Sequence, residues 1–237
     1  MKNIRKTISA IISAAVIFSM VAMPASADWK QEGGKLQYEY ASGKLATNRL
    51  QEIDGVMYKF DSDSYCAGKY TGWTKTKNGG RKYYLDGYSV KGDMPVGKNI
   101  CTFDKDGILT EKTPVAITIT QDTPIHSGDK VIPLTAKLLG KGGYFMIPSS
   151  KFERWENGEW VDCLGEGVEY ITCDCLYDLH SKGYFPEEDD ESLEEKFSFL
   201  PEEYLGTEIT AGYYRLTYYA SGSYDSLTVY AIIKVTD

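Results

Sequence analysis

The residue types best suited to chemistry gather in one stretch of the second half of the chain. Cys163, Cys173, Cys175 and His180 are potential zinc ligands, and Cys175 with His180 is a potential nucleophile and base. A Cys-x-Cys pair on a strand sends its sulfurs to opposite faces, whereas zinc ligands usually come from a turn with about two to four intervening residues. We therefore expect no metal site here, and a disulfide from Cys163 to Cys173 or Cys175 instead.

Other catalytic patterns are not marked. The chain holds only His126 and His180, and it has no Gly-x-Ser-x-Gly, His-Glu-x-x-His or phosphate-binding glycine loop. Carboxylates are abundant, but nothing marks a glycosidase pair. The acidic run FPEEDDESLEE, residues 185–195, offers oxygen ligands for calcium without the spacing or turn glycine of a known loop, so we expect a solvated loop. The expected protein is not an enzyme and needs no cofactor; a hydrolase with an unmarked site is the alternative.

The N-terminus has the layout of a secretory signal peptide. A basic start with Lys2, Arg5 and Lys6 precedes an apolar run over residues 8–22, and small residues follow at 25–27. The apolar run is shorter than the ~20 residues of a membrane span, which argues against an uncleaved anchor. We expect residues 1–27 to be removed, leaving a secreted chain with no membrane span.

Charge divides the remaining chain into two parts, 28–112 and 113–237. The first part carries 14 Lys+Arg and 12 Asp+Glu, and the second carries 9 Lys+Arg and 22 Asp+Glu, giving net charges of +2 and −13. Such asymmetry indicates two domains in different surroundings, and the acidic second part argues against nucleic acid as a partner. Five cysteines leave at least one unpaired; a bridge from Cys66 to Cys101 is a weaker expectation.

The first part contains loose repeats rich in aromatic residues. Four segments share an aromatic or apolar residue, one spacer, a second large apolar residue and a polar turn with glycine: KLQYEYASGKL (35–45), VMYKFDSDSYCAGKY (56–70), RKYYLDGYSVKG (81–92) and NICTFDKDGILT (99–110). The second apolar residues, Tyr40, Phe60, Leu85 and Phe103, are separated by 20, 25 and 18 residues. A period near 20 with frequent glycine predicts a stack of β-hairpins, because a single hairpin cannot bury its aromatic face alone.

Turn geometry predicts which rings face each other. With Gly33-Gly34 as a two-residue loop, Trp29 lies opposite Tyr38. With Asn78-Gly79 as the next loop, Trp73 lies opposite Tyr84; a turn at Gly79-Gly80 would instead place Trp73 opposite Asp86. The expected outcome is a cross-strand aromatic pair in each hairpin.

The stretch GWTKTKNGGRKYYLDG, residues 72–87, resembles the cell-wall-binding repeats of Gram-positive surface proteins, of the choline-binding or glucan-binding type. The resemblance covers residues 29–112, and the other three repeats match more weakly. It implies that aromatic rings of adjacent hairpins form a cage for a quaternary ammonium group, held by cation–π attraction. The ligand-binding residues that it implies are Trp29, Tyr38, Tyr40, Tyr58, Phe60, Trp73, Tyr83 and Tyr84.

This sequence also departs from that family. The first Trp of the family's Trp-Tyr-Tyr run falls on Gln37, Met57, Lys82 and Ile100, and Lys82 would repel a cation. An aromatic surface for sugar rings is therefore an alternative to choline binding. A purely structural role, in which the tyrosines only pack one hairpin on the next, is a further alternative.

The second part has the pattern of an all-β sandwich. Apolar and polar residues alternate in 115–119, 131–139, 197–199 and 216–218, and residues 227–235 are more continuously apolar. In KFERWENGEWVDC a loop at Asn157-Gly158 places Trp155 opposite Trp160 and Phe152 opposite Cys163, and we expect the tryptophans to cover an edge of a core. The segment 113–237 resembles bacterial immunoglobulin-like domains in its VAITIT strand, its Trp hairpin and its AGYYRL strand.

The sequence thus predicts an all-β protein with stacked β-hairpin repeats followed by an immunoglobulin-like β-sandwich. The expected function is attachment to cell-wall polysaccharide or teichoic acid through the repeats, with the acidic domain repelled from an anionic wall. An adhesin that binds a host protein through the acidic domain is the alternative of a different class.

Overall fold

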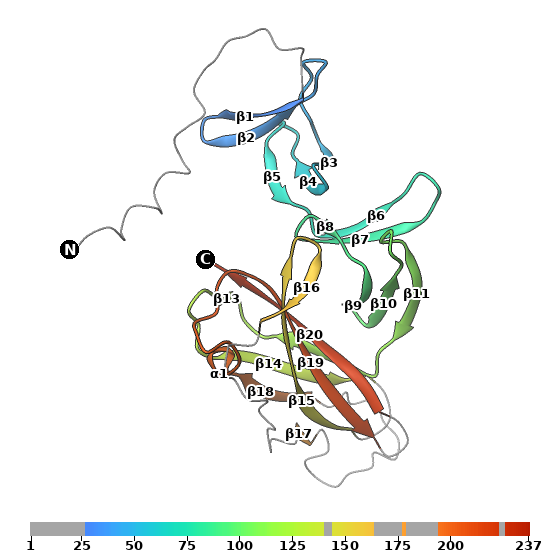
Figure 1. Ribbon diagram of the computed structural model, residues 1–237, viewed down its shortest axis with the longest axis vertical. Coiled ribbons are helices and arrows are strands. Elements are labelled where there is room, and N and C mark those ends of the chain that lie inside the picture. The colour runs from blue at the N-terminus through green and yellow to red at the C-terminus, as the bar shows by residue number, and fades with distance from the viewer. Residues whose placement is uncertain (1–26, 140–143, 164–176, 179–193, 223–225) are drawn as a thin grey trace, which may run out of the picture. The chain divides into compact units, whose positions relative to one another are not determined.

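A computed structural model describes residues 27–139, 144–163, 177–178, 194–222 and 226–237. The expected signal peptide, the acidic run up to residue 193, and Cys173, Cys175 and His180 lie outside these ranges. The described residues form twenty strands and one five-residue helix, so the predicted all-β fold class is confirmed (Figure 1). No helix among them is long and apolar enough to cross a membrane.

The first half is a series of small antiparallel sheets, as predicted. Their orders are β1-β2, β3-β4-β5, β6-β7-β8 and β9-β10-β11. The strands are β1 (Asp28–Glu32), β2 (Lys35–Glu39), β3 (Arg49–Ile53), β4 (Val56–Phe60), β5 (Cys66–Lys69), β6 (Gly72–Lys75), β7 (Arg81–Leu85), β8 (Tyr88–Ser89), β9 (Gly92–Val96), β10 (Asn99–Phe103) and β11 (Leu109–Pro114). Phe60, Leu85 and Phe103 each end the second strand of a hairpin and are buried, which explains their regular spacing.

The turn that follows the second strand has the same form in the β3-β4-β5 and β9-β10-β11 sheets. The N–H of Asp61 donates to the Tyr65 carbonyl, and the N–H of Asp104 donates to the Ile108 carbonyl, both at 2.9 Å. In each turn the aspartate Oδ1 also accepts two backbone N–H groups. This is the local chemistry of an Asx turn, and it shows that the sequence repeats are structural repeats.

Neighbouring repeats approach each other at glycines. The N–H of Met57 donates to the Gly87 carbonyl at 2.7 Å. Gly87 has φ of +83°, and a Cβ atom there would lie 2.6 Å from Val56 Cγ1. The Asp86-Gly87 turn therefore packs its backbone directly on the preceding repeat, at a distance that only glycine permits.

The second half is a larger mixed sheet of nine strands. Its main path runs β16-β15-β19-β20-β12-β14-β18; β13 pairs with β20, and β17 pairs with β15. The elements are β12 (Ile117–Gln121), β13 (Ile125–His126), β14 (Ile132–Leu138), β15 (Tyr144–Glu156), β16 (Glu159–Asp162), β17 (Tyr177–Asp178), β18 (Glu194–Phe199), α1 (Pro201–Leu205), β19 (Gly212–Gly222) and β20 (Ser226–Thr236). The segments with predicted alternation lie in or overlap β12, β14, β18 and β19, and the continuously apolar segment 227–235 lies in β20.

This sheet folds over on itself around one core. The β12–β20 connection is a single parallel bridge, Ile119↔Ala231. Rings from the two ends of the path nevertheless meet: Phe152 of β15 lies 5.1 Å from Phe199 of β18, and Phe197 lies 5.7 Å from Tyr218 of β19. Two antiparallel layers thus face each other, as in a sandwich; membership of the immunoglobulin-like family stays a prediction.

The chain forms two compact units, and their division does not follow the charge pattern. One unit contains residues 27–51 and 58–68, and the other contains 52–57 and the described residues from 69 onward. The larger unit holds a second hydrophobic cluster in which Leu85, Met94 and Phe103 of the repeats surround Trp155. Residues 69–112 therefore share a core with the large sheet; a domain boundary between 112 and 113 stays a prediction.

Candidate functional site

Five of the eight predicted ligand-binding residues form one aromatic cluster in the smaller unit. The Trp29 ring lies 5.4 Å from Tyr38, 5.0 Å from Tyr58 and 5.9 Å from Phe60, and Tyr38 lies 5.7 Å from Tyr40. The predicted pair Trp29↔Tyr38 is confirmed, because Gly33 and Gly34 both have positive φ and form the two-residue loop. Phe60 is buried, and the other four rings are half-buried.

The other three predicted residues lie on the β6–β7 hairpin, where the predicted register is wrong by one residue. Trp73 pairs with Tyr83 and not with Tyr84, and their rings are 5.1 Å apart. The cause is the loop: the Thr76 N–H donates to the Gly80 carbonyl, and within the loop only Gly79 has positive φ. A three-residue loop with glycine in the left-handed position shifts the pairing relative to a two-residue turn.

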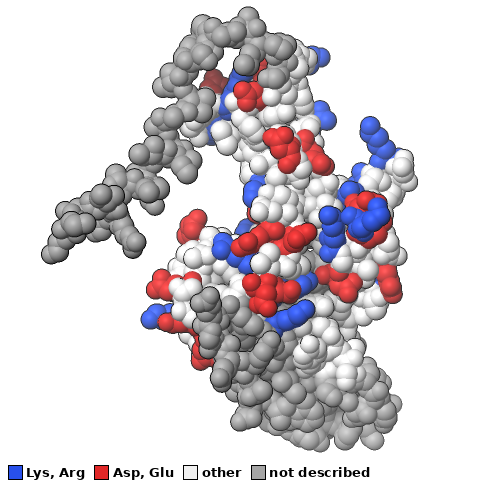
Figure 2. All heavy atoms as spheres, viewed as in Figure 1, with Lys and Arg blue, Asp and Glu red and all other residues white. Residues whose placement is uncertain are grey.

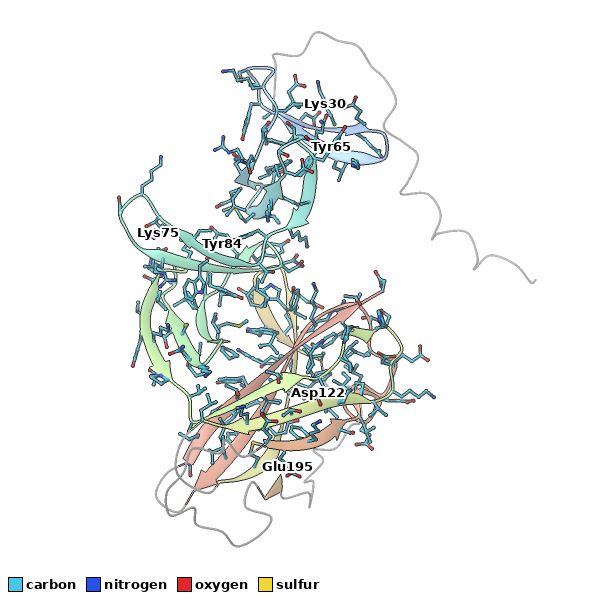
Figure 3. All side chains as sticks on the ribbon, turned by 180° about the vertical axis from the view of Figure 1, so that it is seen from behind. Lys30, Tyr65, Lys75, Tyr84, Asp122 and Glu195 are labelled. Atoms are coloured by element: carbon cyan, nitrogen blue, oxygen red, sulfur yellow. The ribbon has the colours of Figure 1, made fainter. Side chains whose placement is uncertain are left out.

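The register places Tyr84 on the other face of the hairpin, where it is buried. Its hydroxyl donates to Glu52 Oε2 at 3.5 Å, and its ring lies 6.4 Å from Tyr70. Burial, together with the adjacent Glu52 carboxylate, raises the pKa of Tyr84. Tyr84, labelled in Figure 3, is thus a packing residue between repeats, whereas Trp73 and Tyr83 remain half-buried.

Cations of the chain itself lie over several of these aromatic rings. Arg81 is 4.4 Å from the centroid of Trp73, and Arg49 is 5.7 Å from that of Tyr40. Lys35 lies 4.8 Å from the ring of Tyr65, a residue labelled in Figure 3. Each contact is in the range of a cation–π interaction. The sequence reasoning missed these cations, although the correct register puts Arg81 diagonally across from Trp73.

The tryptophan hairpin of the large sheet covers a core, as predicted. Trp155 pairs with Trp160, and the Cys163 N–H donates to the Phe152 carbonyl in the expected register. Trp155 is buried, and its Nε1 donates to the Leu85 carbonyl at 2.9 Å. The pair therefore belongs to packing inside the larger unit, and it offers no open platform for a sugar.

The cysteines of the described residues carry free thiols. Cys66, Cys101 and Cys163 are unpaired, so neither the expected Cys66–Cys101 bridge nor a disulfide of Cys163 is formed. Cys163 Sγ donates to the Phe152 carbonyl at 3.2 Å, and burial raises the pKa of its thiol to about 12. Burial also raises the pKa of Cys101. Both are thus protonated near neutral pH, which is the environment of a packing thiol and not of a nucleophile.

The larger unit also contains a cavity of about 470 Å³. It lies against strands β9, β10, β12 and β20, and its lining is mostly apolar, with Lys98, Gln121 and Tyr230 among the polar members. The lining includes no carboxylate, cysteine or histidine. The cavity therefore offers neither a pair of carboxylates nor a cysteine–histidine pair, the two arrangements considered for a hydrolase.

No family model matches the chain, and a comparison with curated proteins finds no match. Solved structures that match include the pneumococcal cell wall endolysin from phage Cp-1 in complex with choline, at 18% identity over 73% of this chain and 43% of that chain, with a TM-score of 0.25. Choline binding protein F from Streptococcus pneumoniae matches at 23% identity over 57% and 39% of the two chains, with a TM-score of 0.24.

A truncated alternansucrase from Leuconostoc mesenteroides matches at 23% identity over 44% of this chain and 8% of that chain, with a TM-score of 0.24. The chain spans less than half the length of each of these solved proteins. They include enzymes and a choline-binding protein, and at these identities and TM-scores the likeness settles neither the ligand nor the activity of this chain.

Proposed function

We propose that the protein is a secreted, non-enzymatic binding protein that attaches to cell-wall carbohydrate through its hairpin repeats. The observation that carries the proposal is the aromatic cluster of the smaller unit, in which the Trp29 ring contacts Tyr38 and Tyr58 from two other strands and all three residues are only half-buried. Partly exposed aromatic residues gathered in this way mark binding surfaces more often than scattered single ones do.

A sugar fits this surface better than a quaternary ammonium group does. A pyranose presents a flat face of C–H groups that packs on partly exposed rings and removes apolar area from water. A quaternary ammonium would require open ring faces, yet Arg49 already lies over Tyr40 and Arg81 over Trp73. At Tyr40 and Trp73 the chain's own cations thus take the place that a choline group would need.

The charge distribution supports attachment to the cell wall through the repeats. The wall of a Gram-positive cell is anionic, and the residues 28–112 with net charge +2 can approach it, whereas 113–237 with −13 are repelled. We infer that the acidic part of the chain extends away from the wall. Exposure there would allow a protein partner to bind it, which is the role that the adhesin alternative assigns to it.

The test is a pull-down of the secreted chain with purified Gram-positive walls. Trp29→Ala removes the ring that joins the cluster, so we expect retention to fall at least about tenfold. Gln31→Ala is the matched control, because Gln31 is exposed on the same strand. Equal retention of the Trp29 variant, with its fold verified by circular dichroism, would contradict the proposal. Release of labelled fragments from the walls would contradict the non-enzymatic part.

A further inference from the structure

The β6–β7 hairpin carries a cluster of cations that the aromatic site does not use. Lys75, Lys77, Arg81 and Lys82 lie within residues 72–85, a stretch with no acidic residue. We propose that this hairpin binds the phosphodiester groups of an anionic wall polymer of the teichoic acid type. The inference rests on the proposed wall attachment and names a second ligand chemistry at a separate place on the repeats.

The strand register places two aromatic rings and two cations on the same face of the hairpin. Trp73↔Tyr83 and Lys75↔Arg81 are successive pairs on the same face of the hairpin, so two rings are followed by two cations toward the loop. Arg81 lies over Trp73 at 4.4 Å, which orders the guanidinium before any ligand binds. Lys75 is labelled on this hairpin in Figure 3. An ordered guanidinium beside an ammonium suits the oxygen atoms of a phosphodiester.

These cations are uncompensated, which is unfavourable unless an anion binds. Like charges placed directly opposite on paired strands destabilise a sheet, and Lys75 faces Arg81. Within the described part of the chain, the side chains of Lys75, Lys77, Arg81 and Lys82 form no ion pair. The tip of the hairpin shows Lys and Arg atoms without acidic atoms in Figure 2.

The acidic turn beside the hairpin loop does not pair with the hairpin's cations. Gly80 lies close to Ile108, which places the β10–β11 turn beside the loop. In that turn Asp104 Oδ1 accepts the N–H groups of Asp106 and Ile108, and Asp106 pairs with Lys105 at 3.1 Å. Asp104 is thus held by its own turn and Asp106 by Lys105, and among the ion pairs of the described residues neither carboxylate reaches the hairpin cations.

A thin wall polymer suits this site better than nucleic acid does. The cations occupy a single hairpin, whereas the whole chain has a net charge of −8 and would repel a long, rigid polyanion. A flexible polyol-phosphate chain can contact one hairpin and leave the acidic surfaces of the large sheet untouched.

The experiment compares intact purified walls with the same walls stripped of phosphodiester polymers by hydrofluoric acid. The secreted chain should bind intact walls about tenfold or more tightly than stripped walls. The double variant Lys75→Gln/Arg81→Gln should lose that preference, and its binding to intact walls should depend less steeply on salt concentration, because two cation–phosphate contacts are lost. Lys91→Gln/Lys130→Gln removes the same charge from two exposed lysines elsewhere and should bind like the parent.

Each outcome decides the proposal. Equal binding of the parent to intact and stripped walls would overturn this inference and leave carbohydrate attachment standing, while binding to neither would overturn both. Unchanged wall binding by the Lys75→Gln/Arg81→Gln variant, or an equal loss of binding by the control variant, would also overturn the inference. A single-stranded DNA oligonucleotide or an anionic lipid vesicle that binds as tightly as intact walls would assign the hairpin to that other phosphodiester instead.

Discussion

At the scale of single residues, Arg215 is the most connected charged side chain of the larger unit. Its Nε and Nη2 both bond Glu153 Oε2 at 2.7 Å, its Nη1 donates to the Asp93 carbonyl at 3.3 Å, and its guanidinium lies 4.7 Å from the Trp160 ring. The two charged side chains are only 13% and 10% exposed. This ion pair is therefore buried and also connects the β9–β10 hairpin to the large sheet.

Arg215→Met should lower the free energy of unfolding by about 3–5 kcal/mol, because it leaves the Glu153 charge buried without a partner. Urea denaturation measures this loss. The double variant Arg215→Met/Glu153→Met should recover most of it, since no unpaired charge remains. If the single and double variants were equally unstable, packing of the guanidinium on Trp160, and not the charge of Glu153, would explain the effect.

Cys163 gives a prediction about pH. Burial raises the pKa of its thiol from 9.0 to about 12, so the folded state keeps a proton that the unfolded state releases first. The stability that this contributes is present below pH 9 and is lost as the pH rises from about 9 to 12. Under reducing conditions Cys163→Ala should show a shallower fall of stability across that window. A parallel fall in both proteins would show that the buried thiol does not titrate as inferred.

At the scale of elements, glycine is needed in the repeat turns for two different reasons: a positive φ alone, or a positive φ together with close packing. Gly79 and Gly87 have φ of +82° and +83°, but a Cβ at Gly79 meets nothing within 4 Å, whereas one at Gly87 meets Val56 Cγ1 at 2.6 Å. Gly79→Ala should cost about 1–2 kcal/mol of stability from backbone strain alone. Gly87→Ala should cost about 1–3 kcal/mol more, because the neighbouring repeat must move.

Thermal unfolding of the two variants side by side is the appropriate measurement, since the backbone strain cancels in the comparison. Equal losses would mean that the repeats separate freely at this turn. The difference between the two melting temperatures therefore reports directly on the tightness of packing between Gly87 and Val56.

The hairpins were predictable from sequence because their turns are local. Gly33-Gly34 and Asn157-Gly158 fix the pairs Trp29↔Tyr38 and Trp155↔Trp160 through residues that adopt positive φ. The loop over residues 77–79 was not predictable, since Asn78-Gly79-Gly80 also allows two-residue turns at Asn78-Gly79 and at Gly79-Gly80. The choice depends on the Thr76–Gly80 hydrogen bond. Because the strand register is shifted by one residue, the half-buried Tyr83 pairs with Trp73 in place of the buried Tyr84.

The candidate site was predicted only in part, because tertiary packing places the cations that lie over its rings. Turn geometry paired Trp29 with Tyr38, and the resemblance to cell-wall-binding repeats added Tyr58; these rings do meet. The placement of Arg49 over Tyr40 depends on how one repeat lies on the next, and no local pattern encodes it. The same holds for the contact of Trp155 with Leu85, two residues 70 positions apart.

At the scale of the whole molecule, the question is whether the repeats and the large sheet are separate domains. In the larger unit, Leu85, Val90, Met94, Cys101 and Phe103 form one buried cluster with Trp155. The charge pattern predicts a boundary between residues 112 and 113, which stays a prediction, and this cluster joins apolar residues from both sides of it. Charge reports on solvent-exposed positions, so it carries no information about which apolar residues share a core.

Removal of the repeats should therefore destabilise the large sheet. A fragment of residues 113–237 would expose the apolar surface around Trp155 to water, and we expect its melting temperature to lie about 10 °C or more below that of a fragment of residues 52–237. Trp155→Phe in the longer fragment should fall between the two, because it loses only the 2.9 Å hydrogen bond to Leu85 and part of the ring. Equal melting temperatures for both fragments, with unchanged tryptophan fluorescence, would instead make residues 113–237 an independent domain and reduce the shared cluster to a contact between neighbours.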